Sequence, residues 1–89
     1  MNWRSKKLTQ SAKHESCVAC GADDGTVVWA HSNEQRHGKG MGIKAHDLFG
    51  AYLCHRCHSY YDSNPMDSYT WLRDMWERSM IRACMKGYL

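Results

Sequence analysis

Four cysteines arranged in two C-x-x-C pairs are the residues of this chain whose types and spacing most clearly predict chemistry. The pairs are Cys17 with Cys20 and Cys54 with Cys57. Two such pairs can bring four thiolates to one tetrahedral Zn²⁺, and a site filled by four cysteines is structural because it leaves no open position. The alternative is two unrelated redox pairs. The spacing favours a structural zinc site held by all four cysteines.

The distance between the two pairs predicts that a folded module lies between them. Residues 21–53 separate Cys20 from Cys54, and this stretch is longer than the roughly 15–20 residues of a simple zinc ribbon. The run TVVWAH (26–31) is rich in β-branched and aromatic residues and predicts a strand. Residues 43–53 predict a short helical turn that leads into a brief second strand. The zinc ion would therefore stabilise a larger folded module, unlike the zinc ion of a simple ribbon, which is the main part of the fold.

The segment 54–58 also has the C-x-x-C-H pattern that attaches a c-type haem. Haem attachment normally follows export and would leave Cys17 and Cys20 unexplained. The start of the chain has no apolar run of roughly 7–15 residues, as a secretion signal has, and no stretch approaches the roughly 20 apolar residues of a membrane span. The sequence therefore predicts a cytoplasmic protein, and in the cytoplasm cysteine clusters more often bind metal than form disulfides.

Two histidines near the predicted zinc site could hydrolyse a phosphodiester. His31 ends the predicted strand, and His58 follows the second cysteine pair at the start of a predicted short helix. One imidazole can deprotonate water, and the other can help hold a divalent ion that neutralises charge in the transition state. Asp62 lies one helical turn after His58 and would share its face. Its carboxylate oxygens are ligands that Mg²⁺ prefers.

The pattern AHSN…GKGMGIKAHD…LCHRCHSYYD resembles the HNH, or ββα-metal, endonuclease superfamily, and more narrowly the small lambdoid-prophage nucleases of the YbcO-like group. This resemblance implies a metal-dependent DNA endonuclease that acts in phage recombination, replication or packaging, with Mg²⁺ or Mn²⁺ as the catalytic ion. It implies that His31 is the general base and that His58 is a metal ligand. The middle position of the family motif is filled here by His46 and Asp47.

One departure from the family pattern affects the predicted metal site. Ala30 stands where many family members carry Asp or His as a ligand, and alanine cannot coordinate a metal. The catalytic ion would then depend on His58 together with Asp47, His46 or Asp62. A second interpretation is a non-catalytic zinc module that binds DNA or a protein partner. The pairing of His31 with His58 favours the nuclease, because a binding module would not need it.

Positive charge is concentrated in the first 58 residues, which account for all of the formal net charge of +3. Residues 1–13 form a basic arm without an acid, and a glycine-rich basic loop follows the predicted strand. Lysine and arginine in such segments can contact phosphates, although a frayed, solubilising terminus would have the same composition. The residues that we predict to bind DNA are Arg4, Lys6, Lys7, Lys39, Lys44 and Arg56.

A long helix is predicted over residues 66–87, because apolar residues recur at spacings of three and four. These residues are Tyr69, Leu72, Met75, Trp76, Met80 and Ala83. The apolar face predicts either core packing or a homodimer interface, and Cys84 is expected to be a small buried residue. Together, the sequence predicts a single α+β domain. It comprises the basic arm, a zinc-supported ββα-metal (HNH-like) module over residues 14–64, and a C-terminal helix.

Overall fold

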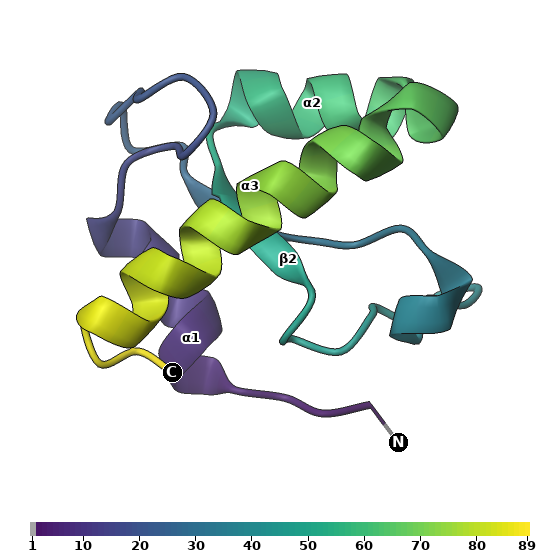
Figure 1. The fold of residues 1–89 in the computed structure, drawn as a ribbon, viewed down its shortest axis with the longest axis horizontal. Coiled ribbons are helices and arrows are strands. Elements are labelled where there is room, and N and C mark those ends of the chain that lie inside the picture. The colour runs from purple at the N-terminus through teal and green to yellow at the C-terminus, as the bar shows by residue number, and fades with distance from the viewer. Residues whose placement is uncertain (1) are drawn as a thin grey trace.

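The computed structural model describes residues 2–89, and over residues 65–68 the backbone alone (Figure 1). Across these residues the chain forms two strands and three α-helices, with two short 3₁₀ turns. In chain order the elements are α1 (Lys6–Ser11), η1 (Ala12–His14), β1 (Val28–His31), η2 (Gln35–His37), β2 (Gly50–Leu53), α2 (His55–Ser63) and α3 (Pro65–Met85). The predicted α+β class is therefore confirmed.

The two strands form an antiparallel pair at the centre of the domain. Val28 lies opposite Leu53, and His31 lies opposite Gly50. Every residue of β2 is buried, and Figure 1 shows α3 crossing over this strand. Helix α2 follows β2 directly, which gives the β–β–α order that the sequence predicted. Residues 43–49 do not form the expected helical turn, and the second strand begins only at Gly50.

Helix α3 and the segment at Val18 cover the edge of β2 that faces away from β1. The backbone N–H of Tyr52 donates to Ser79 Oγ at 3.1 Å, and Val18 N–H donates to the Tyr52 carbonyl at 3.0 Å. These bonds satisfy backbone groups that β1 does not reach. The residues of α3 that are buried in this packing are Leu72, Met75, Ser79 and Ala83. Much of the predicted apolar face therefore lies in the core, and a homodimer through it stays a prediction.

The end of α3 is set by a glycine. Gly87 adopts a φ of 77°, Tyr88 N–H donates to the Ala83 carbonyl at 2.8 Å, and Gly87 N–H donates to the Cys84 carbonyl at 3.3 Å. This is the Schellman arrangement that satisfies the last carbonyls of a helix, and it ends α3 two residues earlier than predicted. The expectation that Cys84 is buried was wrong, since this side chain is exposed. In the described part of the chain, no helix has the length and apolar character needed to cross a bilayer.

The basic arm is more ordered than its composition indicated. Ser5 Oγ accepts a hydrogen bond from the Leu8 N–H at 3.2 Å and caps α1. The Leu8 side chain is fully buried, and Ser11 Oγ lies 2.7 Å from the Tyr52 hydroxyl. The arm therefore packs as part of the domain, although the sequence analysis predicted no element there.

Gly50 has no room for a side chain beside β1, and we expect Gly50→Ala to destabilise the fold. A Cβ at Gly50 would lie 2.6 Å from Trp29 Nε1 and 2.7 Å from the Ala30 carbonyl oxygen. Trp29 cannot turn aside freely, because its indole N–H donates to the Asp47 carbonyl at 2.8 Å. Overpacking of this kind costs about 1–3 kcal/mol, which denaturant unfolding measures.

Gly40→Ala is the matched control for this substitution. A Cβ at Gly40 would meet only the side chain of Ile43, at 3.6 Å, which is an ordinary contact. We expect this variant to unfold at nearly the same denaturant concentration as the wild type. Equal stability of Gly50→Ala and Gly40→Ala would contradict the close approach of the two strands.

Candidate functional site: a cysteine cluster and a histidine-lined cavity

The four predicted cysteines come together from two distant segments of the chain. Their sulfur atoms all lie within 4.8 Å of one another, and the Cys20 and Cys54 sulfurs are 3.6 Å apart. Thiolates about 2.3 Å from a tetrahedral zinc ion lie about 3.8 Å from one another. The cluster of Cys17, Cys20, Cys54 and Cys57 is therefore compatible with a structural Zn²⁺. The two cysteines of the C-x-x-C-H segment belong to this cluster.

Local backbone geometry explains why each pair can present two sulfurs to one point. The Gly21 N–H donates to the Cys17 carbonyl at 2.9 Å, and Gly21 adopts a φ of 79°, a conformation that favours glycine. Cys54 precedes α2, and its carbonyl accepts from the His58 N–H at 2.9 Å. The first pair thus sits on a tight turn and the second at the start of a helix, beside the end of β2.

The protonation behaviour of the cluster fits a cation-binding site. Burial alone would raise the pKa of Cys17, but backbone hydrogen bonds, chiefly from Cys54 and Cys20, outweigh burial and lower the pKa to about 7. At Cys57, burial and the neighbouring thiols both raise the pKa. Several thiolates held this closely repel one another. A divalent cation is therefore what allows all four to be ionised together.

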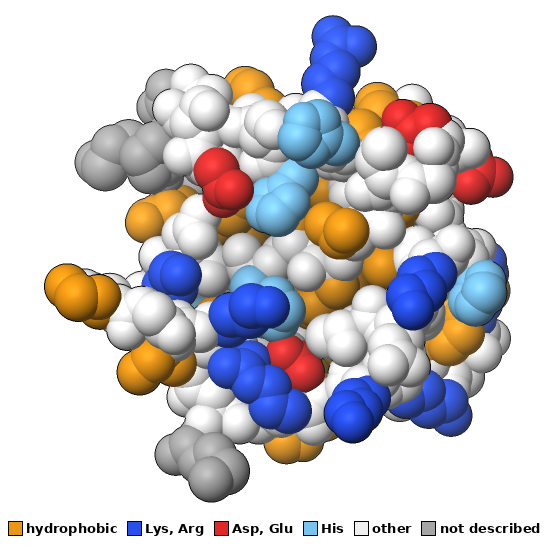
Figure 2. Space-filling model, turned by 180° about the vertical axis from the view of Figure 1, so that it is seen from behind, with side chains coloured by type: hydrophobic (Ala, Val, Ile, Leu, Met, Phe, Trp, Pro, Cys, Tyr) orange, Lys and Arg blue, Asp and Glu red, His pale blue; other side chains and the backbone are white. Residues whose placement is uncertain are grey.

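A cavity of about 350 Å³ lies between β1, the basic loop and α2. Figure 2, which is turned by 180° from Figure 1, shows a face on which histidine side chains and lysine or arginine side chains lie near one another. The cavity is lined by Val28, Trp29, His31, Asn33, Lys39, Lys44, His58 and Asp62. His31 comes from the end of β1 and His58 from the first turns of α2, so the β–β–α order places both histidines at one opening.

The His31 ring is fixed by a buried carboxylate. His31 Nε2 lies 2.7 Å from Asp47 Oδ1, and the His31 and Asp47 side chains are 17% and 6% exposed. An ionised carboxylate only accepts hydrogen bonds, so Nε2 carries the proton and Nδ1 becomes the acceptor of the neutral ring. The geometry therefore gives His31 the tautomer of a base that takes a proton at Nδ1.

The basic arm holds Asp47 in its ionised form. Asp47 Oδ2 accepts from the Ser5 N–H at 2.6 Å, and Oδ1 accepts from Arg4 Nη1 at 3.0 Å. Burial alone would raise the pKa of Asp47, but the hydrogen bonds from His31 and from the arm outweigh burial and lower the pKa. The carboxylate therefore stays negatively charged beside His31.

A second pair of groups lines the same cavity. His58 Nε2 lies 3.4 Å from Asp62 Oδ2, as their spacing of one helical turn predicted. Asn33 Nδ2 donates to Asp62 Oδ1 at 3.0 Å, and the Asn33 N–H donates to the Tyr61 hydroxyl at 2.7 Å. The His58 and Asp62 side chains are 36% and 54% exposed. An imidazole and a carboxylate are thus held together and open to solvent.

The predicted ligands of the catalytic ion do not all gather at one point. Within residues whose side chains the structure describes, groups of three or more metal-ligating side chains are limited to the cysteine cluster. Asp47 is bound to His31 and the arm. His46 does not line the cavity, and its Nδ1 accepts from the Trp3 N–H at 2.7 Å. The predicted ligands that line the cavity are His58 and Asp62.

The predicted DNA-binding residues fall into three groups. Lys39 and Lys44 line the cavity. The Arg4 guanidinium donates to Asp47 and to the Lys44 carbonyl, the latter at 2.8 Å, and its contact with phosphate stays a prediction. The other predicted phosphate contacts, all exposed, are Lys6, Lys7 and Arg56.

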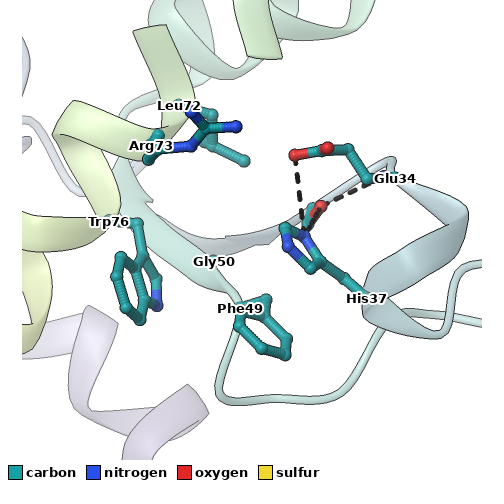
Figure 3. A pocket seen from close by; sticks show the side chains of 8 residues that line it. Glu34, His37, Phe49, Gly50, Leu72, Arg73 and Trp76 are labelled. Carbon is teal, nitrogen blue, oxygen red and sulfur yellow. Dashed lines mark hydrogen bonds and ion pairs between the residues drawn. The ribbon is translucent and has the colours of Figure 1, made fainter. Parts of the chain in front are cut away.

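The sequence analysis missed a smaller cavity of about 120 Å³ between η2 and α3 (Figure 3). The His37 ring stacks on the Phe49 ring, with centroids 4.1 Å apart, and His37 Nδ1 lies 3.7 Å from Glu34 Oε2. Figure 3 shows Trp76 and Arg73 facing these groups from α3. The lining comes from three separate segments, so no spacing motif in the sequence could have indicated it.

Comparison with known proteins gives a family without an assigned activity. Residues 1–82 match the family described as "Protein of unknown function (DUF968)". "Uncharacterized protein YdfU" of Escherichia coli (strain K12) is 39% identical over 59 residues, which cover 64% of this chain and 16% of YdfU. The chain thus matches only a small part of that relative's length. No solved structure matches the chain. The chain belongs to the DUF968 family.

Proposed function

We propose that this member of the DUF968 family is a metal-dependent DNA endonuclease of the HNH type, held together by a structural zinc ion. The observation that carries the proposal is the pairing of two histidines in one cavity. His31 has a buried carboxylate partner, and His58 has an exposed one. The His31–Asp47 pair suits proton abstraction, and the His58–Asp62 pair suits the binding of a divalent cation. Phosphodiester hydrolysis needs both a base and a cation.

His31 acts as the general base in this mechanism. Asp47 fixes the ring through Nε2–H, so that Nδ1 can accept a proton from a water molecule in the cavity. The water oxygen attacks phosphorus as its proton passes to Nδ1, and the P–O bond opposite the attacking oxygen breaks. The charge of Asp47 stabilises the imidazolium that forms. Arg4 and Ser5 act as positioning residues, because they orient Asp47 and do not line the cavity.

His58 and Asp62 would hold the catalytic ion, which we propose is Mg²⁺ or Mn²⁺. A hard cation of this kind binds one or two protein ligands and keeps several waters, and the exposure of both side chains leaves room for those waters. The bound ion supplies charge neutralisation at the phosphate and at the leaving oxygen. Asn33 holds the Asp62 carboxylate in place through its amide N–H.

Lys39 and Lys44 extend the proposed site toward the DNA backbone. Both side chains line the cavity that contains the two histidines, and lysine contacts to phosphate supply much of the affinity of sequence-independent DNA binding. On the resemblance of the sequence to prophage nucleases, we propose that this cleavage serves phage recombination, replication or packaging. The rival function, a zinc module that binds DNA without cutting it, would use these lysines but would not require the His31–Asp47 pair.

A metal titration of DNA cleavage tests the proposed function. We expect His58→Ala to need at least about 10–100-fold more Mn²⁺ for half-maximal plasmid cleavage, because the cation loses its imidazole ligand and even the loss of an outer-shell partner costs that much. Saturating Mn²⁺ should restore part of the rate. The matched control is His55→Ala, which removes an exposed histidine at the start of the same helix. An identical Mn²⁺ dependence of the wild type and His58→Ala would rule out the assigned metal site.

A further inference from the structure

The loop between η2 and β2 presents apolar side chains to solvent beside the proposed active site. Met41, at its tip, is 100% exposed, and Ile43 is 54% exposed. The neighbouring Lys39 and Lys44 line the cavity with the two histidines. An apolar tip flanked by positive charge is the composition of an element that enters a nucleic acid, since the charges contact phosphates and the apolar group contacts bases.

The loop holds Met41 in a defined position. Gly40 and Ile43 exchange two backbone hydrogen bonds of 3.1 Å each, and Gly42 adopts a φ of 69°, which closes the tight turn. The base of the loop is tied to the arm, because Asn2 Nδ2 donates to the Gly38 and Lys44 carbonyls, both at 2.8 Å. Met41 is therefore presented by a braced hairpin rather than by a free segment.

We propose that this hairpin is a DNA wedge, in which Met41 inserts between two stacked bases of a bound duplex. The inference rests on the proposed function and deepens it, because it states how DNA is bent at the same site. Methionine and isoleucine are among the side chains that unstack a base step and kink the duplex. Lys39 and Lys44 contact the phosphates on either side of the kinked step, and the kink turns the scissile phosphate toward the cavity.

Base unstacking can be measured without cleavage. The zinc-loaded His31→Ala chain is mixed with a short duplex that carries 2-aminopurine at several positions, since this base fluoresces more strongly when it is unstacked. Binding should raise the fluorescence severalfold. A further Met41→Ala substitution should remove most of that rise at saturating protein and weaken DNA binding about tenfold. The matched control is Met85→Ala, which removes a methionine that is 83% exposed at the end of α3.

The results of the fluorescence and plasmid assays test the wedge proposal and the nuclease proposal separately. An equal fluorescence rise with Met41→Ala and Met85→Ala would overturn the wedge. Tight binding of the duplex with no rise in fluorescence would also overturn it and would leave the nuclease proposal standing, because cleavage by the wild-type chain is measured independently. If the chain does not bind the duplex at all, the wedge is wrong, and the plasmid assay decides the proposed function by itself.

Discussion

Cys57→Ser is expected to leave the chain without a cooperative unfolding transition. The four sulfurs converge within 4.8 Å from one segment that precedes β1 and one that follows β2, so a bound zinc ion links the turn at Cys17 to the start of α2. Binding of structural zinc contributes about 10–16 kcal/mol of apparent free energy, and this energy is folding energy. That is of the same size as the roughly 5–15 kcal/mol that stabilises a typical domain.

Circular dichroism and elemental analysis measure this result together. The wild type should contain about one zinc ion per chain, whereas Cys57→Ser should lose both the metal and the native spectrum. Cys84→Ser is the matched control, because Cys84 is exposed on α3 and lies outside the cluster. This control should keep the zinc and the fold. A well-folded, zinc-free Cys57→Ser protein would show that the cluster is not a structural metal site.

The cysteine cluster was predictable because each half of it is local in sequence. A C-x-x-C pair places two sulfurs on one turn, and in the first pair Gly21 has the positive φ that closes the turn. The order of the strands and α2 could also be predicted, since β-branched residues precede His31 and the helix begins directly after Cys54. These features depend on spacings of a few residues, which a sequence shows directly.

The partners of Asp47 could not be predicted, because they come from distant parts of the chain. The sequence analysis predicted that Asp47 binds the catalytic ion and that Arg4 contacts DNA. In the structure, Arg4 Nη1 lies 3.0 Å from Asp47 Oδ1. This contact depends on the path of the arm, which packs through Leu8 and α1 although its composition resembles a frayed terminus. Which charged groups are in contact therefore depends on tertiary packing, and no local sequence pattern indicates that packing.

His31→Ala is expected to lower the rate of DNA cleavage about 10²–10⁴-fold, the usual contribution of a general base. The zinc and the fold should be kept, because the His31 side chain lies at the end of β1 and outside the cysteine cluster. The Mn²⁺ dependence should also be kept, since His58 and Asp62 remain. The loss should therefore appear in kcat and persist at saturating Mn²⁺, unlike the loss in His58→Ala.

Two further variants show whether this loss is specific. His14→Ala removes an exposed histidine at the end of η1 and should cleave at the wild-type rate. Asp47→Asn should slow cleavage although His31 remains, because an amide can donate to Nε2 and so favour the wrong tautomer of the ring. A His31→Ala variant that cleaves as fast as His14→Ala at saturating Mn²⁺ would remove His31 from the mechanism.

The most direct test of the central claim is the nicking of supercoiled plasmid by the zinc-loaded wild-type chain. With added Mg²⁺ or Mn²⁺ we predict that open-circular DNA accumulates in proportion to the enzyme concentration, and that without an added divalent ion the plasmid stays supercoiled. A folded chain with its zinc in place that binds the plasmid but leaves it supercoiled at every Mg²⁺ and Mn²⁺ concentration would contradict the nuclease. The non-catalytic binding module would then be the function of this fold.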